Sequence, residues 1–69
     1  MDAVVKKLVQ IRLKKGVSQN RLAELSGMSR SGIRHFESGD TNPTLYSLLK
    51  IGRALGVNLG RVVVANLRK

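Results

Sequence analysis

The segment SRSGIRHFESG, residues 29 to 39, holds the side chains of this chain that are best suited to recognising a ligand. With about 100° between successive residues of a helix, Ile33 and Phe36 fall on one face. The opposite face then carries hydrogen-bonding side chains, namely Arg30, Ser31, Arg34 and His35. Guanidinium and imidazole groups with a hydroxyl group suit a partner that is anionic and rich in hydrogen-bond acceptors.

The same inventory argues against catalysis and against metal binding. The chain has one histidine, four acidic residues and no cysteine, so it contains no pairing of a nucleophile with a base. A lone histidine without thiolates does not form a metal site. We therefore expect neither an enzyme nor a cofactor, and we expect no small-molecule substrate.

Length and composition predict one small helical domain. Sixty-nine residues allow a single domain, residues 1 to 69, and without cysteines its stability must come from packing. Valine, leucine, isoleucine and alanine supply most of the 42% apolar content and recur at helical spacings. The expected fold class is all-α.

The charge of the chain is strongly positive. Thirteen Lys and Arg against four Asp and Glu give a formal net charge of +9, which predicts a polyanionic partner. Nucleic acid is the leading candidate and an anionic membrane surface is the second. The N-terminal residues interleave charged and apolar side chains, so they do not resemble a secretory signal, and no apolar stretch is long enough to span a membrane. We expect a cytoplasmic protein.

Apolar periodicity and capping residues divide the chain into five expected helices. They cover about residues 2 to 15, 19 to 25, 30 to 37, 45 to 55, and 59 to 64, with helix caps expected at Ser18, Ser29, Thr44 and Asn58. Three successive valines leave open whether the last segment, with its tail, is helix or strand. The side chains expected to face inward are Val4, Leu8, Ile11, Leu22, Ala23, Leu25, Leu45, Leu48, Ile51 and Leu55.

Two short helices joined by a tight turn over about residues 18 to 38 form a helix-turn-helix. The stretch SQNRLAELSGMSRSGIRHFESGDTNPTLYSLLKIGRALGV resembles the phage repressor and Cro-like (XRE-type) family of helix-turn-helix DNA-binding proteins. Its motif positions are Gln19, Leu22, Ala23, Gly27, Ser29, Ile33, Glu37 and Gly39, followed by residues 42 to 45 and 54 to 57. The resemblance implies a compact five-helix, lambda-repressor-like domain.

On this reading the outer face of the segment at residues 30 to 37 lies in the major groove of double-stranded DNA. An arginine can donate two hydrogen bonds to O6 and N7 of guanine, so Arg30 and Arg34 are candidates for base reading. In the family, the positions matching Arg30, Ser31 and His35 usually face bases, which leaves Arg34 nearer the sugar-phosphate backbone.

Contacts with phosphate groups are expected from short polar side chains and from the start of the second helix, where unpaired N–H groups favour an anion. The candidates are Ser18, Gln19, Arg21, Ser29, Ser38, Thr41 and Asn42. Ser18 and Ser29 are also expected to cap helices. Arg21 occupies a position where an acidic residue or glutamine would complete a capping box, so it adds positive charge where a phosphate group would lie.

Arg12 lies inside the apolar arc of the first helix, where an unpaired charge would be costly. Its partner must be one of the four acids, and family members commonly pair an arginine here with the glutamate that matches Glu37. The resemblance therefore implies a structural ion pair between Arg12 and Glu37.

Gly32 departs from the family pattern, because relatives usually carry a larger residue there. Glycine inside a helix costs about 1 kcal/mol relative to alanine. One explanation is that the DNA backbone or another helix passes close to Gly32. The other, which we favour, is that a phosphate contact has been lost at this position.

The first helix has a second apolar stripe, Val5, Val9 and Leu13, that one buried face does not require. One interpretation is that the C-terminal segment folds back over it within the chain. The other is that the stripe and the tail at residues 59 to 69 form a dimer interface. The tail residues concerned are Val62, Val63, Val64 and Leu67.

Together these features predict a sequence-specific DNA-binding transcriptional regulator, a repressor that binds an inverted-repeat operator as a homodimer. The alternative within the same fold is an antitoxin or a restriction-modification controller protein. A basic membrane-surface module or a protein-interaction module is the alternative from another class, although turn glycines and scarce aromatic residues argue against membrane binding.

Overall fold

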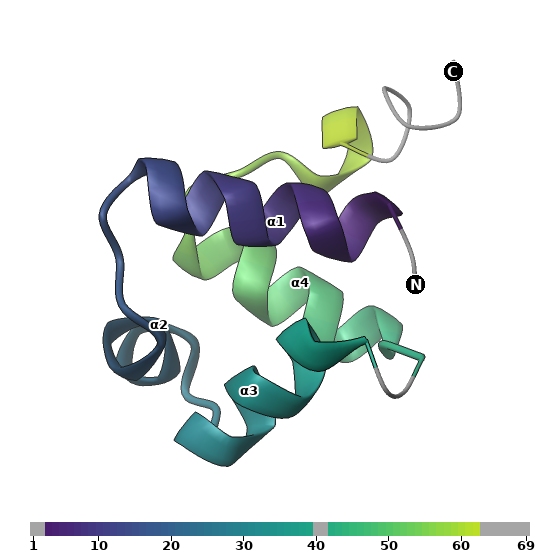
Figure 1. Ribbon diagram of the computed structural model, residues 1–69. Helices are drawn as coiled ribbons and strands as arrows, with labels where there is room; N and C mark the ends of the chain where they lie inside the picture. The colour runs from purple at the N-terminus through teal and green to yellow at the C-terminus, as the bar shows by residue number, and fades with distance from the viewer. Residues whose placement is uncertain (1–2, 40–41, 63–69) are drawn as a thin grey trace.

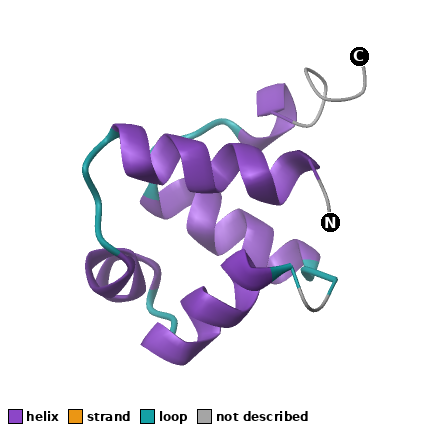
Figure 2. Cartoon of the chain, viewed as in Figure 1, coloured by secondary structure: helices purple, strands orange, loops and turns teal. Residues whose placement is uncertain are grey.

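The computed structural model describes residues 3–39 and 42–62, and within these ranges every regular element is a helix (Figures 1 and 2). The helices are α1 (Ala3–Lys14), α2 (Gln19–Ser26), α3 (Arg30–Ser38) and α4 (Leu45–Ala54). Residues 59–62 are also helical and start the fifth helical segment. The predicted all-α fold with five helices is confirmed, and the predicted boundaries that fall within the described residues agree to within about a residue; the predicted end of the fifth helix lies outside them.

The N-terminus of each of the three helices after α1 is capped by a hydroxyl side chain. Ser18 accepts a hydrogen bond from the backbone N–H of Arg21, Ser29 from that of Gly32, and Thr44 from that of Ser47, each at 3.0 Å. A cap of this kind contributes about 1 kcal/mol because it satisfies a helical N–H that has no partner within the helix. The capping roles predicted for these three residues are confirmed.

The turn between α2 and α3 depends on a glycine. Gly27 has φ of 75° and its N–H donates to the carbonyl of Ala23, so α2 ends in the left-handed conformation. That conformation is open to glycine at little cost and is unfavourable for residues with a Cβ. Because the chain reverses here within a few residues, α3 begins at Arg30, directly after its cap.

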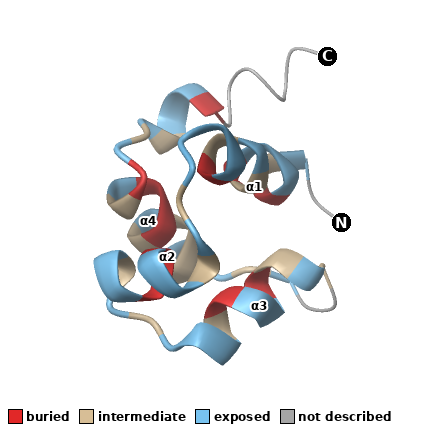
Figure 3. Cartoon of the chain, turned by 60° about the vertical axis from the view of Figure 1, so that its left-hand side comes forward, coloured by how far each residue is buried: buried red, intermediate tan, exposed pale blue. Residues whose placement is uncertain are grey.

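The core is formed where α2 packs against α3 and α4, and α1 closes it (Figure 3). The buried apolar residues of this cluster are Val5, Leu8, Leu22, Ala23, Ile33, Phe36, Ile51 and Leu55. Burying a large aliphatic or aromatic side chain of this kind contributes about 1.5 to 3 kcal/mol. The packing therefore fixes how α3 is rotated about its own axis.

The face that α1 buries differs from the predicted one. Val5 and Leu8 are each only 1% exposed and Arg12 is also buried, whereas Val4 and Ile11 are half-buried at the margin. The helix is thus turned by roughly 60° from the orientation that the apolar pattern predicted. The reason is Arg12, whose charged group has a buried partner and which must therefore face inward.

Two other inward predictions were wrong. Leu25 at the end of α2 and Leu45 at the start of α4 are exposed. Both lie in a terminal turn of their helix. The predicted Leu22, Ala23, Ile51 and Leu55 are buried and belong to the core cluster.

After α4, the chain continues through Val57 and Leu59, which pack against the core cluster. Asn58 accepts a hydrogen bond from the N–H of Arg61 at 3.3 Å, in agreement with its predicted capping role. The helical turn at 59–62 lies beside α1 in both views (Figures 1 and 3). Its last described residue, Val62, is buried.

Candidate nucleic-acid interface

The helix α3 has two faces of opposite character. Ile33 is fully buried and Phe36 is 7% exposed, and together they hold the inner face of the helix against the core. The outer face is exposed and contains the four predicted base-reading residues, Arg30, Ser31, Arg34 and His35. The structure therefore brings these side chains together on one solvent-facing surface at the end of the tight turn, which we call the α3 face.

The arginines of the α3 face have no acidic partner among the described residues. In the part of the chain that the structure describes, the ion pairs are formed by Arg12 and by Arg21. Neither Arg30 nor Arg34 forms an ion pair with a described residue. Their guanidinium groups are therefore available to an external hydrogen-bond acceptor. Binding such an acceptor would not require an ion pair with a described residue to be broken.

The first turn of α3 contains a small hydroxyl cluster. Ser29 Oγ accepts the N–H of Gly32 at 3.0 Å and lies 3.3 Å from Ser31 Oγ, with either hydroxyl able to donate. A Cβ at Gly32 would lie 3.0 Å from Ser29 Oγ, which is closer than side chains normally approach. Glycine therefore leaves room for the capping hydroxyl.

Gly32 also borders a shallow groove beside the α3 face. The groove has a volume of about 170 Å³ and is lined by Met28, Gly32, His35, Phe36, Pro43 and Ser47. The groups nearest to a Cβ at Gly32 are the side chains of Ser29 and Met28. No other described helix packs against this glycine, so helix packing is excluded as its explanation.

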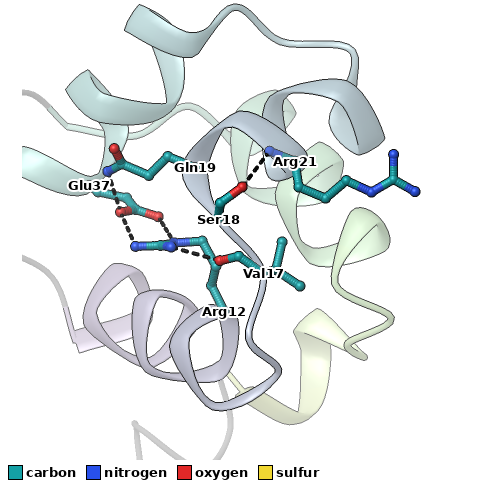
Figure 4. A network of polar contacts seen from close by, with 6 residues as sticks. All are labelled: Arg12, Val17, Ser18, Gln19, Arg21 and Glu37. Carbon is teal, nitrogen blue, oxygen red and sulfur yellow. Dashed lines mark hydrogen bonds and ion pairs between the residues drawn. The ribbon is translucent and has the colours of Figure 1, made fainter.

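Arg12 is held by a buried network that joins three helices (Figure 4). Its Nε donates to Glu37 Oε2 at 2.6 Å and its Nη2 donates to Glu37 Oε1 at 3.0 Å. The side chains of Arg12 and Glu37 are only 10% and 9% exposed. The structure thus brings together the two residues that the family resemblance paired, and α1 is tied to the last turn of α3.

Two further hydrogen bonds complete this network. Arg12 Nη1 donates to the carbonyl of Val17, in the linker before α2, at 2.8 Å. Gln19 Nε2, from the first turn of α2, donates to Glu37 Oε1 at 2.9 Å. Each buried charge therefore has several hydrogen-bonding partners, as a buried ion pair requires.

The side chain of Gln19 has a structural role that the sequence did not predict. The phosphate contact predicted at Gln19 relied on the backbone N–H groups at the start of α2, whereas its side-chain amide points inward to Glu37 (Figure 4). Only its backbone N–H remains suited to an anion at the start of α2. Its motif position gave no indication of this second role, because the pairing depends on how α2 and α3 cross.

The other predicted phosphate contacts differ in their surroundings. Ser18 and Ser29 act as caps, and Asn42 is exposed. Arg21 is exposed and forms an ion pair with Glu24 at 3.0 Å, with side-chain exposures of 60% and 69%. A pair so exposed is weak and would compete little with a phosphate group. Thr41 lies outside the described residues.

The hydroxyl group of Ser38, a predicted phosphate contact, forms a hydrogen bond within α3. Its hydroxyl donates to the carbonyl of His35 at 2.7 Å, so the proton that would bind a phosphate oxygen is already engaged. A contact with DNA would require this hydroxyl to rotate. The bond closes the last turn of α3 instead.

The predicted second stripe on α1 does not form one continuous surface. Val5 belongs to the core, Val9 is half-buried against it, and Leu13 is exposed. Val62 is buried within the chain. Val5 and Val62 are therefore unsuited to a dimer interface, because their apolar surface is already covered. Val63, Val64 and Leu67 lie outside the described residues.

Sequence reasoning missed an exposed apolar surface on α4. Leu45, Tyr46 and Leu49 are all exposed, and the ammonium group of Lys50 lies 4.6 Å from the centre of the Tyr46 ring. The spacing of Leu45 and Leu49 places them on one face of the helix. The spacing of the two leucines is visible in the sequence, but only the packing of the helices shows that they face solvent.

No group of three side chains within the described residues could hold a metal ion. None of the helices in the described part of the chain combines the length and apolar character needed to cross a membrane.

Comparison with known families gives a match over most of the chain. A family model described as helix-turn-helix matches residues 8–62. This range contains α2, the turn, α3 and α4, and thus the whole α3 face. No solved structure gave a significant match.

Several relatives are named as transcriptional regulators. A protein of Haemophilus influenzae named as an uncharacterized HTH-type transcriptional regulator is 42% identical over 60 residues, which are 87% of this chain and 61% of the relative. HTH-type transcriptional regulator PuuR of Escherichia coli is 39% identical over 54 residues, 78% of this chain and 29% of the relative. The prophage-derived HTH-type transcriptional regulator YonR of Bacillus subtilis is 38% identical over 52 residues, 75% of this chain and 48% of the relative. The chain therefore spans less than two thirds of the length of each.

Proposed function

The chain belongs to the XRE-type helix-turn-helix family, and from this premise we propose that it is a sequence-specific regulator of transcription that binds double-stranded DNA. The single observation that supports this most strongly is the division of α3, with Ile33 and Phe36 buried and the arginines of the opposite face exposed. A helix held in this way can enter the major groove without losing any contact with the core.

The α3 face supplies the base contacts in this proposal. Arg30, at the N-terminus of α3, donates two hydrogen bonds to a guanine, and Ser31 and His35 contact neighbouring bases. Arg34 lies closer to the backbone. Each bidentate arginine contact is worth about 1 to 3 kcal/mol of discrimination against a wrong base pair.

Contacts with the phosphate backbone supply most of the affinity. The formal charge of +9 favours association with a polyanion. Arg21, Asn42 and the N–H groups at the start of α2 provide contacts that do not depend on base sequence. The affinity should therefore fall steeply as the salt concentration rises.

We propose that the protein acts as a homodimer and as a repressor. Two α3 helices about 34 Å apart would enter successive major grooves, so the expected operator is an inverted repeat. Of the described residues first assigned to the interface, Leu13 is exposed and Val9 is half-buried. We expect the protein in the cytoplasm, where a chromosome or phage genome is accessible.

An antitoxin or a restriction-modification controller protein remains the second candidate, because both use this fold and the same DNA contacts. The prophage origin in the name of one relative is compatible with either role. Genes next to the one that encodes this chain would distinguish them, since a toxin or a restriction enzyme would be encoded alongside.

Selection of bound duplexes from a random pool tests the base-reading role directly. We expect a palindromic consensus containing guanine. Arg30→Ala should then weaken binding to the consensus by about 10-fold or more and relax the preference at one base pair of each half-site. Equal losses on consensus and random DNA would refute base reading by Arg30.

Arg21→Ala is the matched control, because it removes the same group from a backbone-facing position. It should weaken binding to all sequences alike and lower the slope of log affinity against log salt by about 1. A change in sequence preference in this variant would contradict its assignment.

The homodimer is tested by sedimentation with and without DNA. Removal of residues 63 to 69 keeps the buried Val62 and so separates dimerisation from folding. If the tail forms the interface, the shortened chain should remain folded but sediment as a monomer. A monomer that binds the full palindrome as tightly as the intact chain would argue against dimeric recognition.

A further inference from the structure

The exposed apolar side chains of α4 lie next to a groove that none of the proposed DNA contacts uses. The groove runs between the end of α2 and the second half of α4 and has a volume of about 320 Å³. Its lining residues, which define the α2–α4 groove, are Leu25, Ser26, Lys50, Arg53 and Ala54. No residue of α3 takes part in it.

Several large apolar side chains near the groove are exposed to solvent. Leu45 and Tyr46 are each 67% exposed and Leu49 is 44% exposed. Leu45 and Leu49 are one turn apart, and Leu49 precedes Arg53 of the groove by four residues, so the three lie along one face of α4. Leu25 lines the groove on the α2 side and is exposed. Exposed leucines therefore lie in the groove and along the face of α4 that continues from it.

The charge of this region has one sign. Lys50 and Arg53 line the groove, and α4 contains no acidic residue. Among the described residues, neither cation forms an ion pair, since the acid of α2, Glu24, is paired with Arg21. Lys50 is held over the ring of Tyr46. The groove thus combines apolar side chains with two cations that have no acidic partner.

From this combination we propose that the α2–α4 groove and the adjoining leucines bind an amphipathic helical segment of a partner protein, with apolar anchors and acidic flanks. An amphipathic helix places anchors at intervals of three and four residues, which matches leucines one turn apart. Carboxylates beside the anchors would pair with Lys50 and Arg53 and supply the missing negative charge.

Two other occupants fit the surface less well. A second copy of this chain would bring Lys50 and Arg53 close to the same cations of its partner, in a protein with a formal charge of +9. A DNA backbone would satisfy the cations but would leave the leucines against phosphate groups. Because α3 contributes nothing to the groove, a protein partner can bind while the α3 face is on DNA.

The test uses two synthetic amphipathic helical peptides with identical leucine positions, one with glutamate flanks and the other with lysine flanks. Each is titrated into the isotope-labelled full chain while backbone amide resonances are recorded. We expect the glutamate peptide to shift the resonances of residues around the α2–α4 groove and the lysine peptide to have no such effect. Binding of both peptides alike, binding of neither, or shifts confined to α3 would overturn the proposal.

Substitutions make the assignment specific. Leu49→Gln and Arg53→Glu should each weaken binding of the glutamate peptide by about 10-fold. The matched control is Leu13→Gln, which changes a leucine on α1 that is even more exposed than Leu49 and should leave peptide binding unchanged. Equal effects of Leu13→Gln and Leu49→Gln would show that general hydrophobicity drives the binding. Circular dichroism establishes that the variants are folded.

The same variants separate this proposal from the one for DNA. Leu49→Gln should leave DNA affinity and the sedimentation coefficient unchanged. A loss of DNA affinity in Leu49→Gln would mean that the surface binds DNA. Conversion of a dimer into a monomer would mean that the surface binds a second copy of the chain. Either result would overturn the proposal. Failure of the protein to bind DNA would leave the peptide result unaffected.

Discussion

The ion pair between Arg12 and Glu37 gives the sharpest prediction about stability. Glu37→Ala removes the acceptor of two Arg12 hydrogen bonds and of one from Gln19. It leaves the Arg12 side chain, which is 10% exposed, with the carbonyl of Val17 as its one remaining partner among the described residues. Removing one partner of a buried pair costs about 3 to 5 kcal/mol, because the remaining charge is uncompensated.

This loss is large compared with the stability of the whole domain. At roughly 0.05 to 0.15 kcal/mol per residue, 69 residues give an unfolding free energy of about 3 to 10 kcal/mol. Glu37→Ala should therefore unfold at a much lower urea concentration, or be partly unfolded in water. The measurement is urea-induced unfolding followed by circular dichroism and extrapolated linearly to zero urea.

A double variant separates the charge from the packing. Arg12→Met with Glu37→Leu replaces both ions by apolar side chains of similar size, so no buried charge remains. The double variant should regain most of the unfolding free energy that Glu37→Ala loses. It should remain about 1 to 2 kcal/mol less stable than the original chain, because the amide of Gln19 has lost its acceptor. A double variant as unstable as Glu37→Ala would mean that packing, not charge, limits stability.

The exposed pair of Arg21 and Glu24 is the matched control. With side chains 60% and 69% exposed, both groups are well solvated, so Glu24→Ala should cost less than about 0.5 kcal/mol. If Glu37→Ala lost no more stability than Glu24→Ala, the structural role assigned to the buried network would be wrong.

Substitutions at three further positions examine backbone geometry and capping. Gly27→Ala should lower the unfolding free energy by about 1 to 2 kcal/mol, because alanine is strained at φ of 75°; an unchanged urea midpoint would contradict the tight-turn geometry. Replacing glycine by alanine inside a helix normally stabilises it by about 1 kcal/mol, but Gly32→Ala should show little of this gain because its Cβ would crowd Ser29 Oγ. An increase in melting temperature that corresponds to the whole of this gain of about 1 kcal/mol would show that the Ser29 hydroxyl moves aside at no cost. Ser18→Ala should cost about 1 kcal/mol through the lost cap, and Ser18→Gly only a few tenths, so equal losses in thermal unfolding would argue against capping.

The positions of the helices could be read from the sequence because the signals are local. Ser18, Ser29 and Thr44 cap the helices where the pattern predicted, and the turn at Gly27 has the left-handed conformation. The outward face of α3 followed in the same way, since burying Ile33 and Phe36 determines the direction of the other side chains. These features depend on the geometry of a single helix or turn.

The choice of buried face on α1 could not be read in this way. The helix carries two apolar lines, and only contact with Glu37 of another helix selected the orientation in which Arg12, Val5 and Leu8 face inward. The inward turn of Gln19 has the same origin, because its amide reaches Glu37 only when α2 and α3 cross as they do.

The sequence by itself determined where helices begin and end and which side of α3 is polar, because hydrogen bonds and side-chain periodicity within one segment decide these features. The tertiary structure decided which apolar side chains are covered. Leu25, Leu45 and Leu49 have the same chemistry as the buried leucines, yet they remain exposed because the packing of the described helices does not cover them. Burial depends on the distance and crossing angle between helices, which no single segment specifies.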